Sequence, residues 1–102
     1  MEQPQPVPPG QWYVLIEEQL TKGQSVQWSL TVTDPAGPDA DQARRRAAEA
    51  ALSYVPRHPK RPQGRQVFQT GPDTWLVAVT GAKDAAHFRV SVGVLTAATT
   101  TS

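Results

Sequence analysis

The chain of 102 residues contains no cysteine. It therefore has no disulfide, no thiolate ligand for zinc and no cysteine nucleophile. A domain of this size buries only about two thirds of the surface that its unfolded chain exposes, so its stability has to come from the packing of one small core. The absence of cysteine is typical of proteins in a reducing compartment, and we predict a cytoplasmic location.

Long apolar segments are also missing. The longest apolar run covers residues 12–16, whereas a helix that crosses a bilayer needs about 20 apolar residues. The first ten residues, MEQPQPVPPG, have neither the basic start nor the apolar centre of a secretory signal peptide. We therefore expect no membrane contact and no export by that route.

Motifs that carry chemistry are absent as well. His58 and His87 are the only histidines, and they are not spaced like a pair of metal ligands. The aspartates Asp34, Asp39 and Asp41 lack the spacing and the closing glutamate of a calcium loop. No nucleophile motif and no phosphate-binding glycine loop is present. The sequence predicts a non-enzymatic protein without metal or cofactor, and a small enzyme whose pocket no motif reveals is kept as an alternative.

Proline and small polar residues mark the two ends of the sequence. Four prolines fall within the first nine residues, a composition that favours extended chain over packed structure. Residues 97–102 are small or polar and have nothing to bury. We predict a disordered, proline-rich tail over residues 1–10, a folded domain over 11–96 and a second disordered tail over 97–102.

The domain begins with two segments that have the pattern of β-strands. Residues 12–20 are rich in aromatic and β-branched side chains. A polar stretch with a glycine, residues 21–24, predicts a turn, and residues 26–33 then alternate between apolar and polar side chains. We expect a hairpin whose second strand has one buried face, formed by Val26, Trp28, Leu30 and Val32.

A helix is predicted after the turn-forming sequence at residues 34–39. Asp39 is placed to cap the first turn, with Gln42 three residues later, and Pro56 ends the segment. At 100° per residue one side of this helix is apolar. That side is formed mainly by alanine and is completed at its far end by Tyr54 and Val55; its other members are Ala40, Ala43, Ala47, Ala48, Ala50 and Ala51.

Three further strands are expected over residues 65–70, 75–80 and 88–94, separated by glycine-containing turns. The order of elements is then ββαβββ. The sequence predicts a single α+β domain in which one helix packs on one face of an antiparallel sheet of about five strands.

Charge is distributed unevenly along the chain. Residues 1–41 hold six acids and one lysine, whereas residues 44–65 hold seven cations and one acid. The second segment is a candidate surface for phosphates or for an acidic partner. Cations beyond a helix C-terminus are also favoured by the helix dipole and are commonly only solvated. The candidate binding residues are Arg45, Arg46, Arg57, His58, Lys60, Arg61 and Arg65.

The sheet face turned away from the helix is a second candidate surface. Aromatic, aliphatic and basic side chains fall on it if the strand register brings them together: Tyr13, Leu15, Phe68, Leu76, His87 and Arg89. Such a face can form an interface with a protein or stack on nucleic-acid bases.

Three hypotheses for function follow. The first is a module that binds a protein partner or a second copy of itself through the sheet face or an edge strand. We expect a bacterial protein, because a high content of alanine and arginine is typical of bacteria with GC-rich genomes. The second is a nucleic-acid-binding accessory protein that uses the basic segment at residues 44–65. The third is the small enzyme mentioned above.

Overall fold

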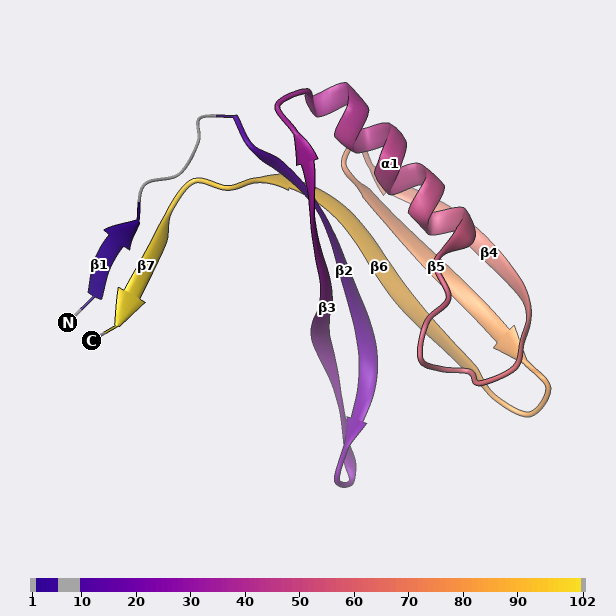
Figure 1. The fold of residues 1–102 in the computed structure, drawn as a ribbon. Coiled ribbons are helices and arrows are strands. Elements are labelled where there is room, and N and C mark those ends of the chain that lie inside the picture. The colour runs from indigo at the N-terminus through magenta and orange to yellow at the C-terminus, as the bar shows by residue number, and fades with distance from the viewer. Residues whose placement is uncertain (1, 6–9, 102) are drawn as a thin grey trace.

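The computed structural model describes residues 2–5 and 10–101 and has the predicted α+β architecture, with one helix packed against an antiparallel sheet (Figure 1). The elements in chain order are β1 (Glu2–Gln5), β2 (Trp12–Lys22), β3 (Ser25–Gly37), α1 (Ala40–Ser53), β4 (Pro62–Gly71), β5 (Thr74–Gly81), β6 (Ala85–Val94) and β7 (Ala98–Thr101).

The main sheet has five strands in the order β3-β2-β6-β5-β4, and every neighbouring pair is antiparallel. Helix α1 lies across one face of this sheet (Figure 1). The predicted order ββαβββ is confirmed for this sheet and its helix. Because β6 pairs with β2, the hairpin of β2 and β3 and the strands β4, β5 and β6 are joined into one layer.

Helix α1 begins where the sequence predicts it. The carboxylate of Asp39 accepts a hydrogen bond of 3.0 Å from the backbone N–H of Asp41, which satisfies one free donor of the first turn. The side chains of Ala43, Ala47 and Ala51 are fully buried against the sheet. Since a methyl group is the largest side chain on this line, the helix backbone can lie close to the strands.

The far end of the helix differs from the prediction. The helix ends at Ser53, and Tyr54 has extended backbone angles, φ −63° and ψ 132°. The chain therefore leaves the helical path before Val55, which is 69 % exposed rather than packed at the end of the apolar side. Tyr54 does fill that end, with its ring centroid 5.3 Å from that of Phe88.

The core lies between α1 and the helix side of the sheet. Alternate residues of the central strands point into it, as expected for strands with one covered face. The buried apolar residues are Val14, Ile16, Ala36, Ala43, Ala47, Ala51, Trp75, Val77, Val79, Phe88, Val90 and Val92.

Strand β3 continues further than its sequence suggests. Residues 34–37 were predicted to break the strand, but Asp34 pairs with Val14 and Pro35 with Tyr13. Proline is tolerated there because β3 is an edge strand, so its missing N–H removes no bond to a neighbour on the outer side. The strand ends only at Gly37, whose φ of +84° favours glycine.

A β-bulge at Thr31 changes the orientation of the first half of β3. Ile16 pairs with Val32, but the next residue of β2, Glu17, pairs with Leu30. Thr31 is the extra residue, and it breaks the simple alternation of side chains along β3.

The bulge overturns one sequence prediction. Val32 packs against the core, but three residues predicted to share its face lie on the opposite side of the sheet. Val26 is 62 %, Trp28 39 % and Leu30 59 % exposed. A shift of one residue in register moves every following side chain to the other face, and period-two reasoning from the sequence does not detect such a shift.

The two segments predicted as tails contain a short pair of strands. Strand β1 pairs antiparallel with β7, from Glu2 with Thr101 to Gln5 with Ala98, as a two-stranded sheet separate from the main one. The rest of the first predicted tail, apart from Gly10, and Ser102 lie outside the described residues, and the division at 11–96 remains a prediction.

Candidate functional site

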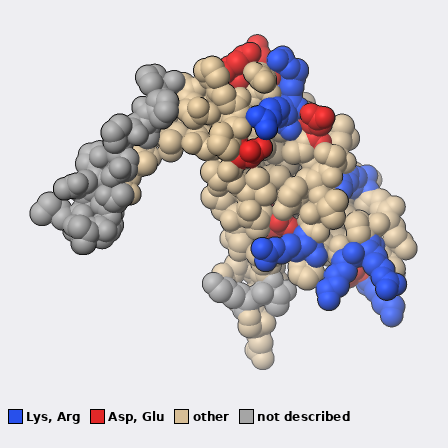
Figure 2. Space-filling model, in the orientation of Figure 1, with Lys and Arg blue, Asp and Glu red and all other residues tan. Residues whose placement is uncertain are grey.

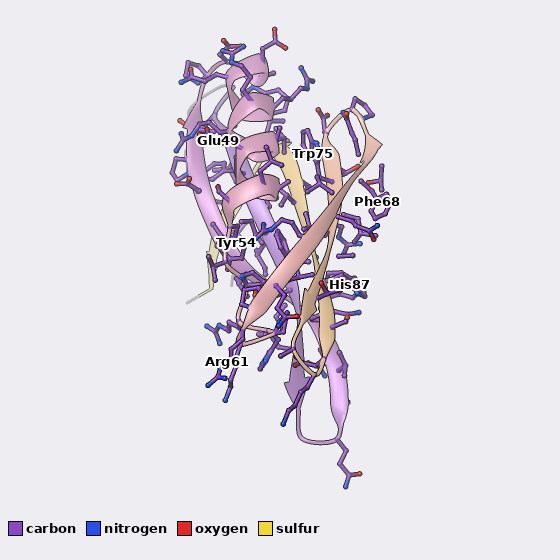
Figure 3. The ribbon with its side chains drawn as sticks, turned by 90° about the vertical axis from the view of Figure 1, so that its right-hand side faces the viewer. Glu49, Tyr54, Arg61, Phe68, Trp75 and His87 are labelled. Carbon is purple, nitrogen blue, oxygen red and sulfur yellow. The ribbon has the colours of Figure 1, made fainter. Side chains whose placement is uncertain are left out.

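The sheet surface opposite α1 brings together all six residues that the sequence placed there. We call it the open face. It carries polar side chains such as Gln19, Thr33, Gln66 and Ser91 and, in addition, the apolar, aromatic and charged side chains of Tyr13, Leu15, Glu17, Val26, Trp28, Leu30, Phe68, Leu76, His87 and Arg89. Phe68 and His87 project from the sheet on the side away from the helix, whereas Trp75 points towards it (Figure 3).

The register aligns five of these residues in one row across the sheet. Leu30 pairs with Glu17, Glu17 with Arg89, Arg89 with Leu76, and Leu76 with Phe68. Directly opposed residues on one face of a sheet have Cβ atoms only about 5 Å apart. The row therefore has an oppositely charged pair at its centre and apolar side chains at both ends.

The centre of the open face is held by ionic and aromatic contacts. Arg89 Nε and Nη2 donate hydrogen bonds of 3.0 and 3.2 Å to the two carboxylate oxygens of Glu17. The guanidinium carbon of Arg89 also lies 4.5 Å from the ring centre of Trp28, a cation–π distance. Trp28 packs edge to face with His87 at 5.2 Å between ring centroids. These contacts restrict the side chains before any partner arrives.

Much of the apolar surface that remains exposed is on this face. In the described part of the chain, four of the seven exposed large apolar residues lie there, namely Val26, Trp28, Leu30 and Phe68. Two shallow pockets of about 270 and 300 Å³ also open on the sheet. The first is lined partly by Tyr13 and Leu15, and the second partly by Leu76 and His87.

Sequence reasoning missed four members of the open face. Val26, Trp28 and Leu30 were assigned to the buried side because the bulge at Thr31 has no recognisable sequence signal. Glu17 was not selected either. Its position in the alternation of β2, two residues after Leu15 and four after Tyr13, places it on this face.

The structure does not keep the seven basic candidate residues together. Two of them stabilise the fold. Arg46 donates to the carbonyl of Pro35 at 3.0 Å and pairs with Asp34 at 3.2 Å, which ties the helix to β3. Arg65 donates to the carbonyls of Ala51 and Tyr54 at 3.0 and 2.8 Å.

The other five basic candidates are exposed. Arg45 lies in the N-terminal half of α1, whereas Arg57, His58, Lys60 and Arg61 belong to the connection between α1 and β4. We call residues 57–61 the basic loop. It adjoins the turn between β5 and β6, residues 82–84, where the two segments line an open surface pocket of about 520 Å³. Lys83, which the sequence analysis did not select, contributes to this pocket.

A buried carboxylate fixes the start of the basic loop. Glu18 is only 2 % exposed, and it accepts hydrogen bonds of 2.6 Å from the Tyr54 hydroxyl and 2.8 Å from the backbone N–H of Arg57. Burial by itself raises the pKa of Glu18, but the nearby hydroxyl of Thr31 and the hydrogen bonds from Tyr54 and Arg57 outweigh it and lower the pKa below 4.5. For Tyr54, burial and the nearby carboxylate raise the pKa of the hydroxyl.

The structure adds two observations about its described part. Over residues 2–5 and 10–101, no three histidine or acidic side chains come together as ligands of a metal ion. Helix α1, the helix of this part, has 14 residues and lacks the length and apolarity needed to cross a membrane.

The open face and the basic loop are both defined by the geometry of this chain. The open face carries exposed apolar and aromatic side chains and one ion pair, and the basic loop is charged and follows the C-terminal end of α1. Comparison of the chain with protein-family models, with curated proteins and with solved structures gives no match.

Proposed function

We propose that this protein is a non-enzymatic protein-binding module that acts in the cytoplasm, and that its open face binds a second copy of the chain. The observation that carries the proposal is the concentration of Val26, Trp28, Leu30 and Phe68 on one uncovered sheet face. Val26, Trp28 and Leu30 are alternate residues of β3, and Phe68 lies on β4 at the opposite edge of the sheet. Exposed apolar side chains on one face cost free energy in water and mark interaction sites. Tryptophan and arginine, both present here, are the residues most often found at the energetic centre of interfaces.

The face is better suited to binding than the edges of the sheet. Both edge strands carry irregularities: β3 has two register shifts and Pro35, and β4 has two register shifts and begins at Pro62. Bulges and prolines at an edge disrupt the row of backbone groups that another strand needs for pairing. We therefore favour face-to-face contact over strand addition.

The charges favour a second copy as the partner. In a two-fold symmetric dimer the same patch meets itself, so each residue of one copy contacts a different residue of the other. Glu17 and Arg89 lie side by side at the centre of the face. Rotation by 180° can place each Glu17 near the Arg89 of the other copy, with apolar side chains meeting around them.

The size of the face is compatible with a dimer. Five strands spaced about 4.8 Å apart, with about eight residues each, make a face of roughly 600 Å² before side-chain relief is counted. A standard interface buries about 800 Å² on each partner.

Sedimentation velocity over a wide range of protein concentration tests the proposal. We expect a monomer–dimer equilibrium that Leu30→Ser weakens by about ten- to hundredfold, since a buried leucine contributes about 1.5 to 3 kcal/mol. Leu52→Ser is the matched control, because Leu52 is 67 % exposed on the helix and lies outside the open face. This control is expected to dimerise normally.

Charge exchange tests the symmetry of the contact. Glu17→Arg and Arg89→Glu should each abolish the dimer, because each places like charges opposite one another, and a mixture of the two variants should associate. A chain that stays monomeric at all concentrations would overturn self-association. If Leu30→Ser and Leu52→Ser weakened the dimer equally, the open face would not be the dimer contact.

A further inference from the structure

We propose that the basic loop and the β5–β6 turn together form a site for the phosphate backbone of nucleic acid. This inference does not depend on the proposed dimer, because Arg61 lies on the helix side of the sheet, opposite Phe68 and His87 (Figure 3).

Cations from two separate chain segments line one concave surface. His58, Lys60 and Arg61 come from the basic loop, and Lys83 comes from the β5–β6 turn. Asp84 is the one carboxylate among the pocket's described lining residues. Arg57 is exposed at the start of the same loop. The site thus carries three permanent positive charges and one negative charge in its lining, with a further cation beside it.

The two segments are packed together and held in place. Pro59 is fully buried, and a Cβ placed on Gly81 would lie 2.6 Å from the Cβ of Pro59, so the loop rests directly on the end of β5. The backbone N–H of Gly81 donates to the carbonyl of Asp84 at 2.7 Å and closes the turn. At its other end, the N–H of Arg57 is bound to the buried Glu18. A pre-ordered loop loses little conformational entropy when it binds.

Elsewhere in the described part of the chain, several charges are neutralised by neighbours. Asp34 pairs with Arg46, and Arg44 pairs with Asp41 and Asp73. In contrast, Lys60, Arg61 and Lys83 make no ion pair with any carboxylate in the described part of the chain. Figure 2 shows acidic (red) and basic (blue) side chains side by side near the start of α1, whereas basic side chains gather below its C-terminal end.

The lining favours phosphates over an acidic protein surface. Protein partners are usually held by aromatic or large aliphatic anchors at the centre of the contact, and Ala82 is the one aliphatic side chain in the described lining. Phosphate contacts need only cations and fix a strand without reading its bases. Because the pocket is open and Arg57 lies outside its lining, the site extends beyond one phosphate group.

Fluorescence anisotropy with a labelled oligothymidine tests this proposal on the full chain. Four cations that each neutralise one phosphate predict a slope of about −3 for log affinity against log salt on a single strand. Lys60→Glu combined with Lys83→Glu should lower the affinity at least tenfold at low salt. Arg45→Glu is the control, because it removes an exposed cation from the other half of the helix and should leave the affinity within about twofold.

Circular dichroism shows whether the double variant is folded. If it is not, Lys60→Gln combined with Lys83→Gln replaces it, with an expected reduction of about 1.4 in the salt slope. Absence of oligothymidine binding at low salt overturns the proposal. So does equal loss of affinity in the Arg45→Glu control, or equally tight binding of a polyglutamate peptide of the same length.

Discussion

Glu18 shows how one buried polar residue connects three parts of the fold. It belongs to β2, the Tyr54 hydroxyl that it binds follows α1, and the Arg57 N–H starts the basic loop. A buried carboxylate without such partners would be costly, and here its described hydrogen-bond donors compensate for the loss of water. No local pattern distinguishes Glu18 from its neighbour Glu17, because both are glutamates in the same predicted strand.

The lowered pKa of Glu18 makes stability depend on pH in a defined direction. The folded state holds the carboxylate ionised more strongly than the unfolded chain does. Its contribution is therefore complete above pH 4.5 and is lost as the pH falls through the lower, folded-state pKa. We expect Glu18→Gln to lose about 1 to 3 kcal/mol of unfolding free energy at neutral pH, the value of hydrogen bonds to a charged group.

Urea unfolding at a series of pH values measures this effect. The unfolding free energies of the wild type and of Glu18→Gln should approach each other as the pH falls. Glu49→Gln removes a charge from an exposed position of α1 and serves as the control for net charge. A constant difference between wild type and Glu18→Gln from neutral pH to below pH 3 would contradict the assignment.

At the scale of elements, the C-terminus of α1 is completed by a strand that is distant in sequence. The last carbonyls of a helix have no partner within it and carry partial negative charge. Arg65 of β4 donates to the carbonyls of Ala51 and Tyr54, and its guanidinium carbon lies 5.8 Å from the ring centre of Phe88. Sequence analysis placed Arg65 in a binding surface; its observed contacts make it part of the fold.

Arg65→Met should therefore destabilise the protein by about 1 to 3 kcal/mol, because methionine keeps the packing of the stem and loses the charged hydrogen bonds. The matched control is Arg45→Met, an exposed helix position where we expect a change within about 0.5 kcal/mol. The midpoint of urea unfolding, with an unchanged slope, is the measurement. Similar losses of unfolding free energy in both variants would show that the loss of a positive charge, and not the loss of the hydrogen bonds from Arg65 to the end of α1, causes the effect.

Strand β3 is the element in which sequence and structure differ most. Its alternation of apolar and polar residues predicted one buried face, and Thr31 divides that face between the two sides of the sheet. The hydroxyl of Thr31 donates to the carbonyl of Ile16 at 3.3 Å, so the bulged residue is itself bonded to the neighbouring strand. The bulge moves Trp28 and Leu30 onto the open face and thereby creates the surface on which the proposed function rests.

For the whole molecule, the layer arrangement decides which apolar residues contribute to stability. Phe88 is 1 % exposed between sheet and helix, whereas Phe68 is 49 % exposed on the open face. The same substitution at the two positions separates the core from the binding surface. We expect Phe88→Ala to cost about 3 to 5 kcal/mol and Phe68→Ala less than about 1 kcal/mol.

Thermal unfolding at concentrations where the chain is monomeric gives this comparison. If Phe88→Ala does not fold, Phe88→Leu replaces it, with a smaller loss that should still exceed that of Phe68→Leu. Equal costs at the two positions would mean that both faces of the sheet are covered in the monomer. A dimer that Phe68→Ala weakens without a change in monomer stability would agree with the proposed function.

Charge at this scale also differs from the count along the sequence. Along the sequence, residues 1–41 are mainly acidic and residues 44–65 are mainly basic. In the structure the two segments neutralise each other at Asp34 with Arg46 and at Asp41 with Arg44. The basic loop lies beyond the reach of these pairs, so its positive charge persists.

Local patterns in the sequence were enough to predict the elements and their order. Turn residues, the Asp39 cap, the alanine line of α1 and Pro56 all act within a few positions of themselves, and together they specify one helix on an antiparallel sheet. Strand alternation likewise placed six residues on the open face. The register shifts beside Tyr13 and Leu15 insert their extra residues in β3 and not in β2, and the shifts of β4 lie near its ends.

Only the tertiary structure decided which side chains act together across the chain. The bulge at Thr31, the pairing of Arg65 with the end of α1, the burial of Glu18 and the meeting of Lys83 with the basic loop all join residues that are far apart in sequence. Each of these contacts depends on how one element packs against another, and the spacing of residues along the sequence does not determine it. The composition of the open face and of the basic surface is therefore a property of the folded chain, not of any segment by itself.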